Sequence, residues 1–343
     1  MAHAKSGLNG GIYDIGVGVD DLVAAAEFWA ACGYRRGPEG HLPAEQAKDL
    51  YGVDSALSSI RLLHQDATAG LIRLMKWDKP TGPGLQMAPL RTHGCRWSVH
   101  RTDNIANAYV HGEIWRRQGN SIHLVGPHYN FDLANKMKDK KPFRDVLAAS
   151  GDLLLFLPEA QLVAMTRMNF SVPKYGTINT ASPLRLSEGC HMALVVQGED
   201  IGVFDFYEDV IGFKRYHQVD IEYEPGYMPS DMFHLTHEES FSEVDFDDPE
   251  AGDDPAEHLP GRLRCFIMRS PKPADDRLDR SQPGHLGYSL YTVRVGDVSA
   301  MHQKVTESSA THVTGITGDE FDAPAFSFKA PDGFTWSVIA HET

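Results

Sequence analysis

One histidine in this sequence is well placed for chemistry, because it stands at the head of an apolar strand. His191 is the second residue of the stretch CHMALVV, in which alternate side chains would pack into a core while His191 faces the other side. An imidazole in that position could ligate a metal ion or exchange a proton near neutral pH. In MFHLTHEES, by contrast, His234 and His237 would point to opposite faces of a strand, so they could not ligate one ion together.

Other reactive patterns are missing from the sequence. It contains no P-loop, no G-x-G-x-x-G and no G-x-S-x-G, so it gives no support for a nucleotide-binding protein or a serine hydrolase. The four cysteines are widely separated and form no C-x-x-C pair. We therefore expect reduced, mostly buried thiols instead of a disulfide framework or a zinc site.

The charge and hydropathy of the chain argue against nucleic acid and membranes as partners. The 343 residues carry 32 basic and 47 acidic side chains, a net charge of −15 that argues against nucleic acid or an anionic membrane. The longest aliphatic and aromatic run, LLLFL, is far shorter than the ~20 residues that span a bilayer. The N-terminus lacks the apolar core of a signal peptide. We expect a cytoplasmic protein with a small-molecule substrate, and we leave a homo-oligomer open.

The elements that would position a site form an internal repeat. Residues 13–36 and 190–215 both read as an alternating strand, an acidic residue, a helix with an aromatic pair, and a glycine followed by an aromatic ring. Residues 95–119 and 288–310 are weaker copies. The pattern predicts four strand–helix–strand–strand–strand modules and an α+β fold.

Caps and short strands complete each module. Asp21 and Asp200 suit the N-cap of a helix, and Gly33 and Gly212 suit the left-handed position that ends one. Short strands are predicted at residues 59–63, 71–76, 152–156, 162–168, 232–236, 262–268 and 326–329. Residues 238–257 hold ten acids and no Lys or Arg, and we interpret them as a mobile loop.

Two halves are expected on either side of a linker. Residues 172–189 are rich in Pro, Ser, Thr and Gly, which is typical of a connection between domains. We therefore predict an N-terminal domain over residues 10–171 and a C-terminal domain over residues 190–343, each built from two modules.

The signatures DDL…FW…GY and ED…FY…GF and the terminal PDG-x-x-W hairpin resemble the vicinal oxygen chelate (VOC) superfamily over residues 10–342. That superfamily includes glyoxalase I, extradiol dioxygenases, methylmalonyl-CoA epimerase, and bleomycin and fosfomycin resistance proteins. The resemblance implies that pairs of modules curl into cupped mixed sheets holding a divalent metal, iron or manganese. The tandem four-module form is most similar to extradiol dioxygenases, which implies an active C-terminal half.

The resemblance also implies where metal ligands should stand in the C-terminal half. His191 matches the first-strand ligand of module three. Tyr288 stands as far before Asp297 as His191 stands before Asp200, so it matches the ligand of module four. Ser337 falls where a Glu ligand is expected in the final hairpin. Neutral hydroxyl groups are poor ligands for a divalent ion, so one conventional ligand of three remains.

In the N-terminal half the resemblance places Asp14 and Arg73 at ligand positions, and an arginine there would repel a metal ion. The two side chains could bind a carboxylate substrate, or they could form a buried ion pair that closes an inactive site. His217, Tyr223 and His234 follow the third helix, where the superfamily places substrate-contacting loops, and they are candidate substrate contacts.

Two functions remain open. The first is a VOC enzyme acting on a small oxygenated, potentially aromatic molecule, with His191 as base or surviving ligand and Tyr288 as acid or oxyanion donor. Without a metal this would be lyase or isomerase chemistry, and with iron it would be ring cleavage. The second is a non-catalytic small-molecule binding protein of the resistance or sequestration type.

Overall fold

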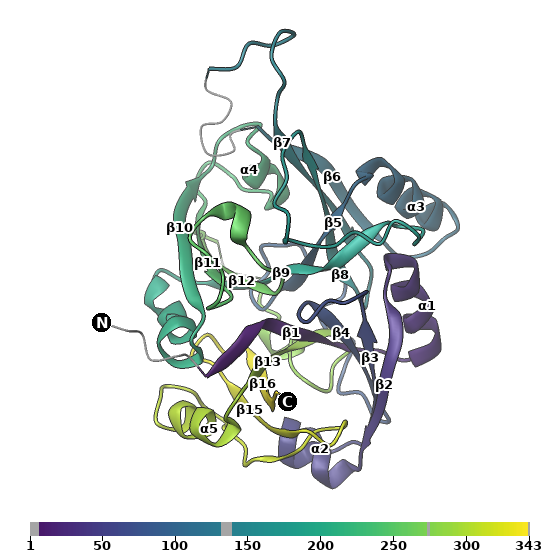
Figure 1. Ribbon diagram of the computed structural model, residues 1–343, viewed down its shortest axis with the longest axis vertical. Helices are drawn as coiled ribbons and strands as arrows, with labels where there is room; N and C mark the ends of the chain where they lie inside the picture. The colour runs from purple at the N-terminus through teal and green to yellow at the C-terminus, as the bar shows by residue number, and fades with distance from the viewer. Residues whose placement is uncertain (1–6, 132–138, 273–274, 342–343) are drawn as a thin grey trace.

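The computed structural model describes residues 7–131, 139–272 and 275–341 (Figure 1). The strands are β1 (Leu8–Gly18), β2 (Arg35–Leu42), β3 (Leu57–Leu63), β4 (Leu71–Trp77), β5 (Arg96–Thr102), β6 (His123–Asn130), β7 (Ala149–Phe156), β8 (Gln161–Met168), β9 (Leu186–Gln197), β10 (Lys214–Glu222), β11 (Ser240–Asp247), β12 (Arg262–Arg269), β13 (Gly287–Val295), β14 (Thr317–Gly318), β15 (Pro324–Lys329) and β16 (Thr335–Ala340). The α-helices are α1 (Leu22–Cys32), α2 (Ala44–Tyr51), α3 (Ile105–Arg117), α4 (Met228–Met232) and α5 (Val298–Thr306).

The predicted capping residues Asp21 and Asp200 begin the helical turns that follow β1 and β9. Asp21 accepts hydrogen bonds from the backbone N–H groups of Val23 and Ala24 at 2.8 and 3.1 Å, and α1 ends at Gly33 with φ 110°. In module three Asp200 accepts the same kind of bond, but a 3₁₀ turn (Ile201–Phe204) and a π-helical turn (Tyr207–Ile211) replace the predicted α-helix. The capping residues were thus predictable, and the helix type was not.

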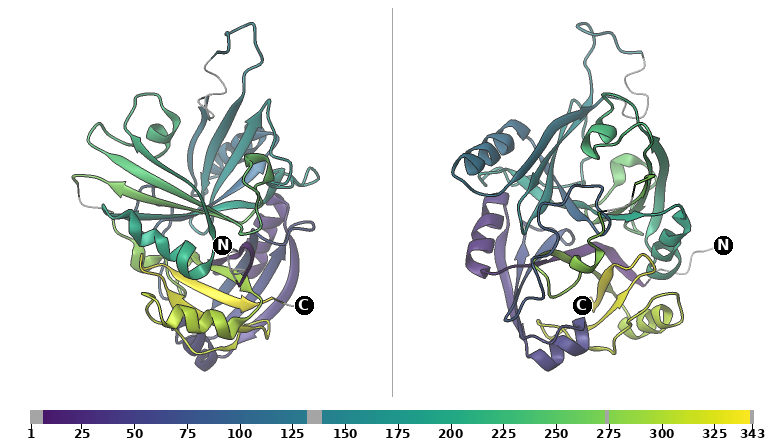
Figure 2. Two further views of the ribbon diagram at one scale, coloured as in Figure 1. Left: turned by 60° about the vertical axis from the view of Figure 1, so that its left-hand side comes forward. Right: turned by 180° about the vertical axis from the view of Figure 1, so that it is seen from behind.

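The strands form two mixed sheets of eight (Figure 2). The first sheet has the order β14-β15-β16-β13-β1-β4-β3-β2, and the second has the order β10-β11-β12-β9-β5-β8-β7-β6. Within a module the first and last strands are parallel, as β1 and β4 are, whereas first strands of two modules pair antiparallel, as β1 and β13 do. The α+β fold with two cupped mixed sheets is therefore confirmed.

The pairing of modules differs from the expected one. Modules one and four share the first sheet, and modules two and three share the second. In a single module one edge of the first strand is unpaired, so a second module must pair with it to complete the sheet. Module one pairs with module four, which is not its neighbour in sequence. The connections β4–β5 and β12–β13 cross between sheets side by side, linked by bridges Gly82–His285 and His93–Asp276. An N-terminal cup and a C-terminal cup, each from one half of the chain, are therefore wrong.

Three apolar cores follow from the alternation of strand residues. The largest lies between the sheets and under α1, α3 and α5. The other two lie on the opposite faces, which we call the first cup (on the first sheet) and the second cup (on the second sheet). Helix α2 packs into the first cup, and aromatic rings fill much of the second. Each cup also carries a group of buried charged residues beside its apolar core.

Three local expectations are corrected. The strand expected at 232–236 is the end of α4 and a turn. The acidic run 238–257 contains β11, because Arg262 and Arg264 on the neighbouring strand pair with its acids. The expected linker 172–189 overlaps the start of β9 and contributes the buried Tyr175 to the second cup. Among the described residues, no helix is long and apolar enough to cross a membrane.

Candidate active site

The residues expected to form a site lie in separate places. Asp14, Arg73 and Ser337 lie in the first cup, where Asp14 pairs with Thr292 and Thr292 pairs with Ser337 in the strand register. His191 lies in the second cup.

Tyr288 lies in neither cup. It is buried in the core between the sheets, where its hydroxyl contacts Ser98 Oγ at 2.7 Å. The strand register places Thr292, not Tyr288, opposite Asp14. The prediction for Tyr288 is wrong because the distance from this position to the helix cap is shorter in module four than in module three.

In the first cup, protein side chains surround the Arg73 guanidinium. It lies 3.3 Å from Asp14 Oδ1 and 3.2 Å from Glu320 Oε1, and it donates to the Tyr51 hydroxyl at 2.9 Å and to the Thr292 hydroxyl. Arg73 and Asp14 are fully buried. Of the two interpretations from sequence, this geometry corresponds to the buried ion pair.

The charges of the first cup stabilise each other. Burial alone would raise the pKa of Asp14, but the charges of Arg73 and Arg61 outweigh it and lower that pKa below its usual range. The Arg61 Nε atom lies 3.0 Å from Asp14 Oδ2. A divalent cation would replace these contacts at the cost of repulsion from two guanidinium groups. The residues of the first cup therefore do not fit a metal.

In the second cup His191 forms a pair with a tyrosine that the sequence analysis missed. His191 Nδ1 lies 2.5 Å from the Tyr175 hydroxyl, and the two rings are nearly parallel, at 19°. Burial and the charges of Arg264, Arg262 and Arg167 hold the pKa of His191 well below its usual value, so the imidazole is neutral at pH 7. When Nδ1–H donates to the Tyr175 oxygen, Nε2 is the basic nitrogen.

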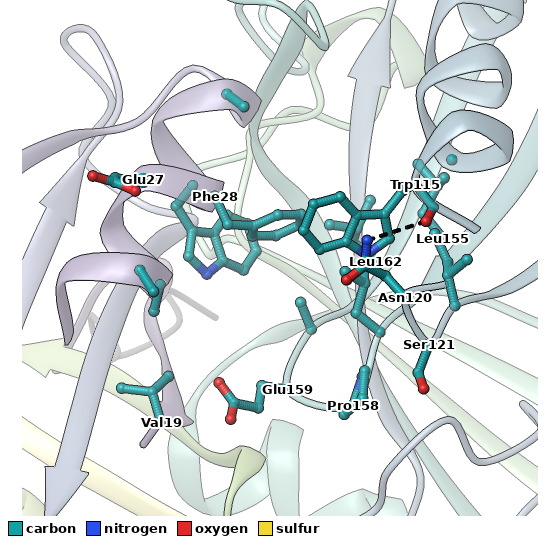
Figure 3. A pocket seen from close by; sticks show the side chains of 18 of the residues that line it. Val19, Glu27, Phe28, Trp115, Asn120, Ser121, Leu155, Pro158, Glu159 and Leu162 are labelled. Atoms are coloured by element: carbon teal, nitrogen blue, oxygen red, sulfur yellow. Dashed lines mark hydrogen bonds between the residues drawn. The ribbon is translucent and has the colours of Figure 1, made fainter. Parts of the chain in front are cut away.

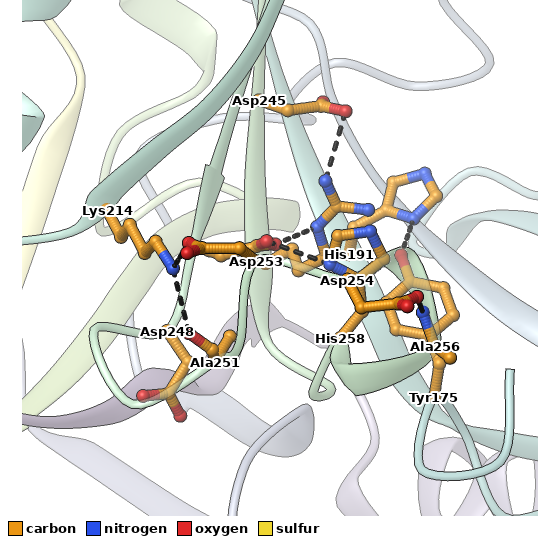
Figure 4. A network of polar contacts seen from close by, with 12 residues as sticks. Tyr175, His191, Lys214, Asp245, Asp248, Ala251, Asp253, Asp254, Ala256 and His258 are labelled. Atoms are coloured by element: carbon orange, nitrogen blue, oxygen red, sulfur yellow. Dashed lines mark hydrogen bonds and ion pairs between the residues drawn. The ribbon is translucent and has the colours of Figure 1, made fainter.

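A network of charges holds the strands around this pair (Figure 4). Asp245 lies 2.6 Å from Arg264 Nε and 3.1 Å from Arg262 Nη2. Arg262 also pairs with Asp247, and the His258 Nδ1 atom lies 2.8 Å from Asp247 Oδ2. These acids belong to β11, within the run expected to be a mobile loop. The network holds Arg262 and Arg264 beside His191, and Asp245 and Asp247 neutralise their charges.

Two further charged residues of the second cup, Arg167 and Asp152, form no ion pair with the described residues. Arg167 on β8 forms no ion pair with the described residues, and its buried Nη1 has no hydrogen-bond partner among them. Its guanidinium lies 5.0 Å from the Tyr175 ring centre. The buried Oδ1 of Asp152 on β7 also lacks a partner within the described part, and burial raises the pKa of Asp152 to about 6 despite Arg264 and Arg167. On its strand each of these residues stands two positions from an apolar residue of the cup face, Leu154 for Asp152 and Met165 for Arg167, and this spacing was the available sequence signal.

The remaining candidates lie at the rim. His217 on β10 is opposite Asp245 in the register and is exposed. Tyr223 follows β10 with 38% of its surface exposed. His234 is an exposed residue of the turn after α4, where its carbonyl accepts from Arg91. His217 therefore borders the charged network, whereas the structure gives no contact of Tyr223 or His234 with His191.

The second cup does not fit a metal either. The strand neighbours of His191 in the register are Val99 on β5 and Arg262 on β12, which supply no ligand atom for a divalent cation. Across the described ranges, no group of three His, Cys, Asp or Glu side chains is arranged to hold a metal ion. What the second cup offers is a neutral imidazole, a phenol and a free guanidinium, which can move a proton and stabilise an oxyanion.

Comparisons with known proteins give a family-model match and several structures with similarity to this chain. A family model described as Glyoxalase/Bleomycin resistance protein/Dioxygenase superfamily matches residues 202–338. Glyoxalase I from Zea mays has a TM-score of 0.51 at 12% identity, covering 97% of this chain and 92% of that chain. A variant of 4-hydroxymandelate synthase from Streptomyces coelicolor gives a TM-score of 0.29 at 10% identity, covering 97% of this chain and 93% of that chain.

A halotolerant catechol dioxygenase gives a TM-score of 0.27 at 12% identity, covering 98% of this chain and 88% of that chain. No curated protein sequence gives a significant match. The likeness to the maize structure shows a shared fold, and the family model shows the shared sequence pattern in modules three and four. Residues 202–338 therefore match the glyoxalase/bleomycin resistance protein/dioxygenase superfamily, and the chain as a whole shares the fold of maize glyoxalase I.

Proposed function

We propose that the second cup is the active site of a lyase- or isomerase-type enzyme that moves a proton on a small oxygenated anion. The observation that carries this proposal is the His191–Tyr175 pair, 2.5 Å apart, beside a guanidinium that has no acidic partner among the described residues. A neutral base and a fixed cation are what proton abstraction next to a carboxylate or carbonyl requires.

Each group has a separate role in this proposal. His191 accepts the proton at Nε2, and its hydrogen bond to Tyr175 orients the ring. Arg167 binds the substrate carboxylate and stabilises the negative charge that develops on oxygen. Asp152, whose pKa is raised to about 6 by burial, carries a proton within the second cup at mildly acidic pH.

The apolar part of the second cup limits the size of the substrate. Trp97 and Phe266 stack with ring centres 5.2 Å apart, and Phe233 packs against both. All three are buried, so the protein itself occupies that part of the cup. We therefore propose a small substrate held at the polar end, with an aromatic substituent only if it reaches out past the rim.

Hydrogen–deuterium exchange tests the proposal without knowledge of the product. Aryl- and alkyl-substituted 2-oxo acids are incubated with the protein in D₂O, and loss of the proton next to the carbonyl is followed by NMR. We expect catalysed exchange for at least one acid, reduced by about 100-fold or more in His191→Ala. Tyr175→Phe should reduce the rate less, since it disturbs only the orientation of the imidazole.

His41→Ala, an exposed histidine of the first sheet, is the matched control and should keep the full rate. Undiminished exchange in His191→Ala would contradict the assignment of the base. Binding of an acid without any exchange would favour the non-catalytic binding protein instead.

A further inference from the structure

A pocket separate from both cups lies between α1 and α3 (Figure 3). Its volume is about 740 Å³, within the range of sites for drug-sized ligands. Helix α1 and the end of β1 form one wall, and α3 with the β7–β8 turn forms the other. The pocket therefore lies at the seam between modules one and two, which are consecutive in sequence but belong to different sheets.

The pocket exists because the two helices present small side chains to each other. Ala24, Ala25 and Ala31 of α1 and Ala108 and Gly112 of α3 line it. Helix α1, LVAAAEFWAAC, is apolar on nearly all sides, a composition usually found in a fully buried helix. Part of the surface of α1 is nevertheless not covered by the rest of the protein, so apolar side chains face solvent here.

Large aromatic side chains form the rim. Trp115 of α3 is 44% exposed, and Phe28 of α1 is partly exposed. Figure 3 shows these two rings on one side of the opening and the Glu159 carboxylate on the other. Exposed tryptophan and phenylalanine faces attract cations through their π-electrons as well as apolar groups by burial.

The charge of the pocket has one sign. Among the described residues that line it, four are acidic and none is Lys or Arg; the acids are Asp20, Asp21, Glu27 and Glu159. Burial and the neighbouring charge of Asp20 raise the pKa of Glu159. A ligand cation would relieve this repulsion, whereas an anion would add to it.

We propose that this pocket binds a hydrophobic cation, an aromatic or aliphatic amine or quaternary ammonium compound, with its apolar part between α1 and α3. The cation lies between the Glu159 carboxylate and the aromatic rim. This site is independent of the proposed active site, since none of its lining residues belongs to the second cup described above.

Two fluorescent probes of similar size and opposite charge test the proposal. Berberine is a permanent planar cation, 1-anilinonaphthalene-8-sulfonate is an anion, and both brighten in apolar surroundings. We expect one berberine per chain and at least tenfold weaker binding of the anion at this site. Trp115→Ala should weaken berberine binding by about tenfold, and Glu159→Gln by about fivefold, while Glu159→Gln improves binding of the anion.

Controls separate the pocket from the rest of the protein. Glu45→Gln, an exposed acid of α2, and His191→Ala in the second cup should leave berberine binding unchanged. Ala24→Phe fills the pocket from an exposed helix position and should abolish binding, which keeps the test valid if Trp115→Ala fails to fold.

Several results would overturn the proposal. Equal binding of both probes, or berberine binding that Glu159→Gln and Ala24→Phe leave intact, would show that charge and pocket play no part. Absence of berberine binding together with a dimer in sedimentation that Trp115→Ala dissociates would show that a second copy of the chain covers the groove.

Discussion

The two cups are built from the same module yet use arginine in opposite ways. In the first cup the Arg73 guanidinium contacts Asp14, Glu320, Tyr51 and Thr292, so the protein itself satisfies it. In the second cup Arg167 faces the His191–Tyr175 pair without an acidic partner among the described residues. The sheet supplies the positions in both cups, whereas the segments that cover each cup decide whether those positions remain free for a ligand.

The largest effect on stability is expected from removing the Arg73 contacts in the first cup. Arg73→Ala leaves Asp14 and Glu320 as buried charges with one fewer partner, and we expect it to lower the free energy of unfolding by about 3–5 kcal/mol. Urea denaturation measures the loss. Arg36→Ala, which removes the exposed pair with Glu39, is the control and should change little. A small loss for Arg73→Ala would mean that the first cup is not held by this network.

The stability of the fold should depend on pH through two buried histidines, His191 in the second cup and His100 between the sheets. Burial lowers the pKa of His191 well below 6.5, and it lowers the pKa of His100, between the sheets, to about 4. The unfolded imidazoles bind protons below pH 6.5, while folded His100 stays neutral down to about pH 4. Stability is therefore full above pH 6.5 and falls as the pH drops from 6.5 to 4, by up to about 3 kcal/mol from His100, with a further loss of the same sign from His191.

Urea midpoints between pH 4 and 7.5 check this slope. His191→Asn and His100→Asn should each flatten it. Arg36→Ala, which removes only the exposed pair with Glu39, should leave the slope unchanged. An unchanged slope in both histidine variants would contradict the assignment.

Removing the free arginine should cost function more than stability. Arg167→Ala loses a cation–π contact with Tyr175, which is worth about 1 kcal/mol. Binding of a 2-oxo acid that undergoes exchange should weaken by about tenfold or more, because a charge-assisted hydrogen bond is lost. Isothermal titration calorimetry measures the affinity, and a stability loss as large as that of Arg73→Ala would show that the two arginines do not differ in the proposed way.

The smallest effect is expected at the predicted ligand position of the final hairpin. The Ser337 hydroxyl is buried in the first cup and has no hydrogen-bond partner within the described residues. Ser337→Ala should therefore change the unfolding free energy by less than about 1 kcal/mol, in either direction. Ser98→Ala removes contacts of 2.7 Å to both His100 and Tyr288 and should cost more. Thermal melts of the two variants compare them directly.

The fold of each module could be predicted because the same local signals repeat along the sequence. Asp21 and Gly33 delimit α1 as predicted, and the alternation around His191 placed its side chain on the cup face. The pairing of modules is a long-range choice that no local pattern encodes. The error at Tyr288 has the same origin, since the register of β13 against β1 depends on that pairing.

The candidate site was only partly predictable. Tyr175 reaches His191 from a segment whose composition is typical of a linker, so nothing in its neighbourhood in sequence marks it. Asp245 and Asp247 belong to an acidic run that resembles a solvent-exposed loop. The arginines that neutralise them come from another strand, so the sequence around them gave no sign of a buried network. Side chains that meet only through tertiary structure leave no periodic signal.

The exchange of modules between sheets has a consequence for biosynthesis. The second sheet is built from residues 96–269, a continuous segment, whereas the first sheet joins β1 at one end of the chain to β13 and β16 at the other. Contacts of such large sequence separation close late, because the entropy of the intervening loop opposes them. On the ribosome, the second sheet can therefore assemble first, while residues 8–77 wait with one strand edge open until the last module emerges.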